Sequence, residues 1–137
     1  MQTRRLKMRR ARGMTLIEII VVITILALLT AAVTVAVIPQ LDAAKCKTAK
    51  EDIATLMNGL KIYYAKKGNY PDTGTGLKAL IDSQIVEKTK DPWDSDYLYL
   101  NEGGKPAITS YGKDKAPGGE KWDADISSKN LDQACKD

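Results

Sequence analysis

Apolar side chains run almost without interruption along the first part of the chain. Residues 14–38 contain one charged residue, Glu18, and otherwise only apolar side chains and threonines. As an α-helix this stretch measures roughly 37 Å at about 1.5 Å per residue, enough to cross a hydrocarbon core of about 30 Å. The pattern therefore predicts a membrane-spanning helix over residues 14–38.

Charged residues begin to alternate with apolar ones after Pro39. Over residues 40–67, apolar side chains recur every three or four positions, which is typical of one buried face of a helix: Leu41, Ala49, Ile53, Leu56, Leu60 and Tyr63. A proline removes one helical hydrogen bond and tends to kink the helix, but the pattern predicts that the helix continues past it. Gly68 is the expected stop.

Short apolar stretches separated by glycine, proline and aspartate follow Pro71. Residues 97–100 and 107–111 have the pattern of two β-strands, and Glu-Gly-Gly-Lys at residues 102–105 has the composition of the turn between them. The chain is therefore predicted to have an α+β fold, in which a small antiparallel sheet packs on the long helix.

Charge is distributed very unevenly along the chain. Six of the 21 lysines and arginines lie within residues 1–13, where no acidic residue occurs, and the rest of the chain carries 15 basic against 17 acidic residues. The positive-inside bias then keeps the N-terminus cytoplasmic and sends the C-terminal part across the membrane. A nucleic-acid partner is not expected, because its basic surface would lie on the folded part.

Catalytic groups are scarce. The sequence has no histidine, and no nucleophile with a partner base stands out, so we do not expect an enzyme.

Glu18 is the unusual residue of the apolar segment. A carboxylate inside an apolar helix costs up to about 3 kcal/mol and usually marks a functional contact with a cation. The alternative, that Glu18 merely lies at the level of the lipid headgroups, stays open on this ground.

The region around Glu18 also carries a motif. A basic leader, a glycine, an apolar residue and then a glutamate, RGMTLIE at residues 12–18, resemble the type IV prepilin signal. The resemblance implies that a prepilin peptidase removes residues 1–13 by cutting between Gly13 and Met14, and methylates the new amine of Met14. It further implies that Glu18 binds the N-terminal amine of a neighbouring subunit and sets the axial register of a filament.

Motifs farther along the chain resemble the major, G-type pseudopilin of type II secretion. They are Gly68-Asn69-Tyr70-Pro71, Gly76-Leu77-Lys78-Ala79-Leu80, Asp91-Pro92-Trp93 with Tyr97, Ser110-Tyr111-Gly112-Lys113-Asp114 and Asp123-Ala124-Asp125-Ile126. The resemblance implies a pilin-like lollipop fold, with residues 39–137 as a periplasmic domain anchored in the inner membrane.

The same resemblance implies a structural role. The chain would leave the membrane to polymerise into a periplasmic pseudopilus that helps drive proteins across the outer membrane. Its partners would be further copies of itself, minor pseudopilins, the prepilin peptidase and an inner-membrane assembly platform. A type IV pilus subunit for adhesion or motility, and a non-polymerising single-pass anchor with a periplasmic binding domain, are the alternatives. Glu18 argues against the anchor, which has no use for a charge there.

An acidic, glycine-rich loop lies near the C-terminus. Asp114, Asp123 and Asp125 bracket it, and hard oxygen ligands suit calcium better than a transition metal. By spacing alone, such a loop is more often solvated surface. The pseudopilin resemblance implies a calcium site here, formed by the three aspartates and the backbone carbonyl of Tyr111.

Cys46 and Cys135 both follow the apolar segment, so both lie on the same side of the membrane. If that side is oxidising they can form a disulfide, which would tie the tail to the helix. Two unpaired thiols are the alternative, because pairing requires the Cα atoms to come within about 7 Å.

Overall fold

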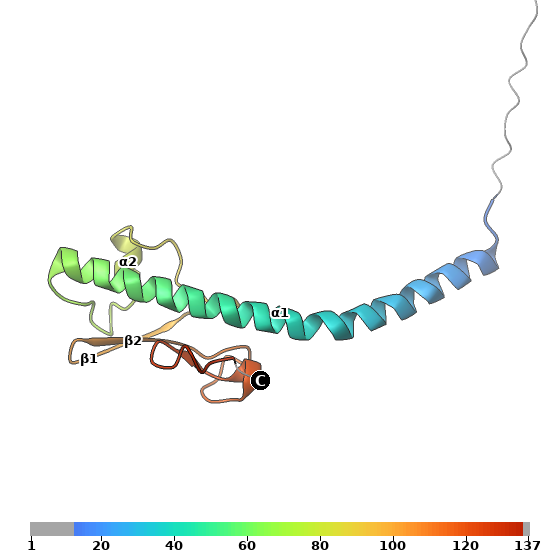
Figure 1. The fold of residues 1–137 in the computed structure, drawn as a ribbon. Coiled ribbons are helices and arrows are strands. Elements are labelled where there is room, and N and C mark those ends of the chain that lie inside the picture. The colour runs from blue at the N-terminus through green and yellow to red at the C-terminus, as the bar shows by residue number, and fades with distance from the viewer. Residues whose placement is uncertain (1–12, 136–137) are drawn as a thin grey trace, which may run out of the picture. The chain divides into compact units, whose positions relative to one another are not determined.

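The computed structural model describes residues 13–135, so most of the basic leader, residues 1–12, lies outside the described residues. The elements are α1 (Leu16–Lys67), α2 (Lys78–Asp82), β1 (Leu98–Glu102), β2 (Lys105–Ser110), the 3-10 turn η1 (Lys121–Asp123) and β3 (Ile126–Ser127) (Figure 1). A long N-terminal helix and a small antiparallel sheet confirm the predicted α+β class. By its internal contacts the chain divides into two units between Val37 and Ile38.

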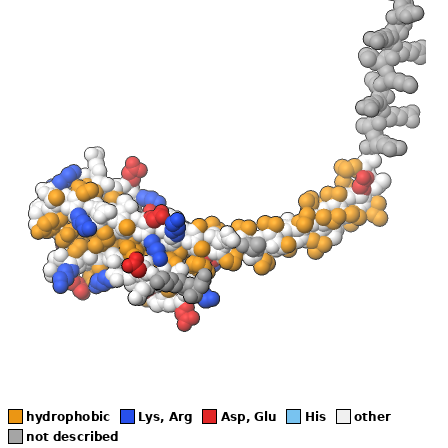
Figure 2. All heavy atoms as spheres, viewed as in Figure 1, with side chains coloured by type: hydrophobic (Ala, Val, Ile, Leu, Met, Phe, Trp, Pro, Cys, Tyr) orange, Lys and Arg blue, Asp and Glu red, His pale blue; other side chains and the backbone are white. Residues whose placement is uncertain are grey.

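The first unit contains the N-terminal part of α1, which is apolar and long enough to cross a membrane by length and composition. Its large apolar side chains are exposed, and Figure 2 shows them along the face in view. The hydroxyls of Thr24 and Thr30 donate to the carbonyls of Ile20 and Leu26 at 2.7 Å, and that of Thr34 donates to the carbonyl of Thr30 at 2.9 Å. These polar groups are therefore satisfied within the helix, as a lipid environment requires.

The second unit is built around one face of the C-terminal part of α1. The buried positions of this face are three and four residues apart: Asp42, Cys46, Ala49, Ile53, Leu56 and Leu60. The prediction was wrong for Leu41, which is 52% exposed. Neighbouring residues of a helix point about 100° apart, and here Asp42 lies on the buried face while Leu41 lies off it.

Helix α1 continues through Pro39 and ends where the sequence predicts. Gly68 adopts a φ of 82°, and its N–H donates to the carbonyl of Tyr64 at 2.8 Å. A left-handed residue directly after the last helical turn is the common way for a helix to end, and glycine adopts that conformation without a steric cost.

Three antiparallel strands form the sheet in the order β1-β2-β3. Gly103 and Gly104 both have positive φ, as a two-residue hairpin turn requires, which confirms the predicted hairpin. Ile108 of β2 and Ile126 of β3 are 0% and 1% exposed, and they join α1 and Leu80 of α2 in one core.

A buried carboxylate fastens the loop before β1 to the sheet. Asp91 is 6% exposed, and its Oδ1 accepts hydrogen bonds from the backbone N–H groups of Trp93 and Ser95 at 3.0 and 2.8 Å. Its Oδ2 accepts a hydrogen bond of 2.6 Å from the hydroxyl of Ser110 at the end of β2. Both oxygens are thus engaged, which accounts for a carboxylate in the interior without a metal.

Candidate functional site

The start of helix α1 carries the residues of the predicted processing and assembly motif. The N–H of Thr15 donates to Glu18 Oε2, and the N–H of Glu18 donates to the hydroxyl oxygen of Thr15, each at 3.3 Å. This reciprocal pair is a capping box, which satisfies two N–H groups that have no partner within the helix. Glu18 therefore caps its own helix in the isolated subunit.

The residues on either side of the predicted cleavage point are accessible. Met14 is 70% exposed, and a Cβ added at Gly13 would meet nothing within 4 Å among the described residues. Gly13, Met14 and Glu18 lie close together along the chain at the start of α1, and all three are exposed. An enzyme or a second subunit could reach all of them.

The acidic loop near the C-terminus is wound tightly by its own backbone. The N–H of Lys113 donates to the carbonyl of Trp122 at 3.1 Å, and the N–H of Asp125 donates to the carbonyl of Gly118 at 3.2 Å. A Cβ at Gly112, whose φ is 71°, would lie 2.9 Å from the carbonyl oxygen of Trp122. A Cβ at Gly119 would overlap the carbonyl of Asp123, so the sequence needs glycine at both places.

The predicted calcium ligands lie on this loop but are not gathered into one cluster. Within residues 13–135, no three acidic or cysteine side chains lie close enough together to hold a metal ion. The carboxylate of Asp114 accepts from the N–H of Ala116 at 3.1 Å, and Oδ2 of Asp125 accepts from the N–H of Gly118 at 3.1 Å.

One buried side-chain oxygen in the loop has no hydrogen-bond partner. Oδ1 of Asp125 is buried and accepts no hydrogen bond, and a buried, unsatisfied carboxylate oxygen is costly unless a cation or water contacts it. Hard oxygen donors from carboxylates and backbone carbonyls are the set that calcium prefers. The donor chemistry of the loop therefore fits calcium.

Two contacts join the C-terminal part of the chain to one turn of α1. Lys113 Nζ lies 2.7 Å from Asp42 Oδ2, and the neighbouring carboxylate raises the pKa of Lys113. Cys46 and Cys135 form a disulfide, with Cα atoms 6.2 Å apart and a sequence separation of 89. Sequence reasoning considered the cysteine pair but missed the ion pair, because no local pattern links residues that lie 71 positions apart.

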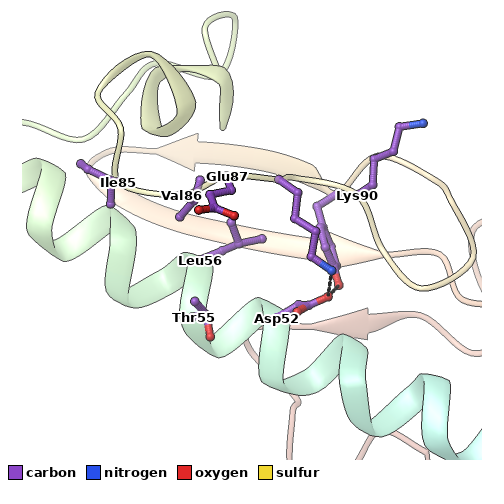
Figure 3. Close-up of a pocket in the computed structure, with 9 residues that line it drawn as sticks. Asp52, Thr55, Leu56, Ile85, Val86, Glu87 and Lys90 are labelled. Carbon is purple, nitrogen blue, oxygen red and sulfur yellow. Dashed lines mark hydrogen bonds and ion pairs between the residues drawn. The ribbon is translucent and has the colours of Figure 1, made fainter.

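A groove of about 320 Å³ runs beside α1 and was not predicted. Figure 3 shows Asp52 and Leu56 of α1 facing the segment that carries Ile85 and Val86. The hydroxyl of Tyr97 donates to Asp52 Oδ2 at 3.2 Å. Burial, together with the charge of Asp52, raises the pKa of Tyr97 far above its usual range. The hydroxyl of Tyr97 and the carboxylate of Asp52 are therefore engaged with each other at the wall of the groove.

Comparison with known proteins matches two family models to the chain. The model described as Type II secretion system (T2SS), protein G matches residues 36–129, and the model described as prokaryotic N-terminal methylation motif matches residues 8–34. The second match covers the glycine, the methionine and the glutamate of the processing motif.

Relatives and a solved structure agree with these models. The Type II secretion system core protein G of Vibrio cholerae serotype O1 is 35% identical over 91% of this chain and 96% of its own length. That of Pectobacterium carotovorum subsp. carotovorum is 38% identical over 90% of this chain and 88% of its own length. The crystal structure of the major pseudopilin from the type 2 secretion system of enterohaemorrhagic Escherichia coli has a TM-score of 0.55 and 27% identity, and covers 66% of this chain and 90% of that one.

These names favour a secretion pseudopilin, and none of these matches favours a pilus adhesin or a simple membrane anchor. A family model that matches more than half of the chain, together with relatives of 35% and 38% identity, decides the assignment. The chain therefore belongs to the type II secretion system protein G family, the family of the major pseudopilins.

Proposed function

We propose that this chain is processed at the membrane and then polymerises through residues 14–38 into the pseudopilus of a type II secretion system. One observation carries the proposal: the apolar part of α1 is unburied and bears its single charge, Glu18, at its capped N-terminus. Outside a bilayer, so much exposed apolar surface requires another covering, and packing against the helices of further subunits supplies it. Head-to-tail contacts that do not close into a ring produce a filament.

Processing would give the subunit its mature N-terminus. In this proposal a prepilin peptidase cuts between Gly13 and Met14 and methylates the amine of Met14, which is supported by the match of residues 8–34 to the methylation motif. The amine would then pair with Glu18 of a neighbouring subunit, which offsets the cost of a carboxylate in an apolar surrounding. The basic leader would keep the N-terminus cytoplasmic and place residues 39–137 in the periplasm.

The role that we propose is structural and not catalytic. The partners would be further copies of the chain, minor pseudopilins and an inner-membrane assembly platform. The names of the relatives connect them to type II secretion, and in this proposal the pseudopilus would push secreted proteins toward the outer membrane.

The mass of the mature N-terminus tests the processing step. In cells with a prepilin peptidase, the N-terminal peptide is expected to begin at Met14 and to carry one added methyl group. In cells without the peptidase, the same peptide is expected to be absent and the leader to remain attached. An intact leader in both strains would contradict the proposal.

Calcium is the second part of the proposal. Asp114, Asp123, Asp125 and the backbone carbonyl of Tyr111 would hold the ion, and the support is the unsatisfied oxygen of Asp125 together with the donor chemistry of the loop. The ion would supply positive charge where the loop concentrates carboxylates. Asp114 at the start of the loop and Asp123 and Asp125 at its end would then bind the same ion, which brings the two ends of the loop together.

Calorimetric titration of the mature chain in detergent micelles tests the calcium site. Asp123→Ala is expected to weaken calcium binding by about tenfold or more, because affinity at such sites follows the number of charged ligands. Asp123 is exposed, so its loss does not disturb the core. Asp132→Ala removes another exposed carboxylate, one outside the loop, and serves as the matched control. Equal affinity in the two variants would refute the ligand set.

A further inference from the structure

We propose that the ion pair between Asp42 and Lys113 positions the acidic loop, residues 113–125, where calcium is proposed to bind. The pair would do so by holding Lys113, the first residue of the loop, against helix α1 before the ion binds. The inference rests on the proposed calcium site. It makes Asp42, a residue of the long helix, a positioning residue that acts on the loop through Lys113 without contacting the ion.

The burial of Asp42 sets this pair apart from the other ion pairs of the described residues. The side chain of Asp42 is 9% exposed, whereas the carboxylates of the Lys88 and Lys90 pairs are 23% and 82% exposed. A carboxylate taken out of water is strongly unfavourable without a partner, whereas an exposed pair contributes little. Asp42 therefore restrains the Lys113 side chain far more than an exposed partner would.

The backbone transmits this restraint to the loop. The N–H of Lys113 donates to the carbonyl of Trp122 at 3.1 Å, and Trp122 directly precedes the proposed ligand Asp123. On the other side, the N–H of Gly112 donates to the hydroxyl of Ser110, which is itself fixed to the buried Asp91. Fixing Lys113 thus brings together the residues next to Asp114 and Asp123, the proposed ligands at the two ends of the loop.

The downstream end of the loop has its own anchor. Ile126 is 1% exposed, belongs to β3 and pairs with Ser110 of β2, so the chain is held directly after Asp125. The disulfide of Cys135 acts nine residues later and restrains the tail. The upstream end is held by the backbone hydrogen bonds of Gly112 and Lys113 and, at the Lys113 side chain, by the ion pair with Asp42. The Asp42–Lys113 pair therefore ties this end of the loop to helix α1.

A loop that is already held in place loses less conformational freedom when it binds an ion, and affinity rises accordingly. Residues that orient metal ligands without touching the metal typically change metal affinity by about 10–100-fold when they are replaced. For Lys113→Met and for Asp42→Asn we expect calcium to bind about tenfold more weakly, the lower end of that range, because the pair acts at one end of the loop only.

The test uses the mature full-length chain in detergent micelles, with two measurements for each variant. Calorimetry gives the calcium affinity, and hydrogen exchange without calcium gives the protection of the backbone amides of residues 113–125. Lys113→Met is expected to weaken calcium binding about tenfold and to speed exchange in the loop by a similar factor. Lys88→Met, which removes the lysine of an exposed pair, is expected to change neither.

A double variant separates positioning from loss of stability. Asp42→Asn combined with Lys113→Met leaves no buried charge unpaired, so the chain should stay folded while the restraint on the loop is lost. It is expected to bind calcium as weakly as Lys113→Met. Wild-type affinity and wild-type loop exchange in the double variant would overturn the inference.

The two proposals fail in different ways. If the wild-type chain takes up no calcium, the proposed calcium site is wrong, and hydrogen exchange still tests the ion pair. Faster loop exchange in the double variant would then support the restraint, and unchanged exchange would refute it. If the wild type binds calcium but the variants bind it equally well, the calcium site stands and the positioning role falls.

Discussion

Glu18→Gln is expected to abolish filament assembly while leaving the start of helix α1 intact. Glutamine serves as well as glutamate in a capping box, so the reciprocal bonds with Thr15 can be kept. The substitution removes only the negative charge that would pair with the N-terminal amine of a neighbouring subunit. Cross-linking in membranes should give a ladder of multimers for the wild type and monomers for the variant.

Two further variants separate the causes of such a loss. Glu18→Asp keeps the charge but shortens the side chain, and should retain part of the ladder. Glu51→Gln removes an exposed glutamate from the second half of α1 and should assemble as the wild type does. A normal ladder from Glu18→Gln would show that the carboxylate does not act in assembly, and the headgroup alternative for this residue would then be preferred.

The second large effect is expected from the disulfide. Breaking the bond between Cys46 and Cys135 should lower the free energy of unfolding of the globular part by about 4 to 5 kcal/mol, since the bond joins residues at a sequence separation of 89. For a domain of this size, such a loss corresponds to a fall in melting temperature of about 20 °C. The expected shift is large because the bond encloses nearly all of the globular part.

Thermal unfolding with and without a reductant measures this effect. The variant with Cys46→Ala and Cys135→Ala should melt as the reduced wild type does, and the reductant should not affect it further. Alanine is the suitable replacement at position 46, because the side chain there is 1% exposed and a serine would bury a hydroxyl. Equal melting of the oxidised and reduced wild type would refute a stabilising role for the bond.

Local patterns were sufficient for the main elements of the fold. The long helix follows from its apolar segment and from the three- and four-residue spacing of Ala49, Ile53, Leu56 and Leu60. The hairpin follows from Gly103 and Gly104, since few other residues accept two consecutive positive φ angles. Strand β3 has only two residues and α2 only five, which is too short for any periodicity to appear.

Long-range contacts could not be read from the sequence in the same way. The apolar spacing placed Leu41 on the buried face, but the structure buries Asp42 instead, where Lys113 supplies a partner for the carboxylate. For the acidic loop, ligand chemistry and the pseudopilin resemblance pointed to Asp114, Asp123 and Asp125 but not to the distances between them, which depend on the left-handed turns at Gly112 and Gly119. Ligand type is a local property of the sequence, whereas convergence of ligands depends on the whole fold.

The disulfide also determines how the subunit responds to mechanical load. Residues 46–135 form a covalently closed ring, because the bond joins Cys46 on the helix to Cys135 near the end of the chain. When the chain is pulled between the N-terminal helix and the C-terminal end, tension passes from Cys46 to Cys135 across the sulfurs, and the enclosed chain cannot be drawn out as an extended strand. A subunit pulled from the bilayer into a growing polymer would keep its fold under forces that unravel an open chain.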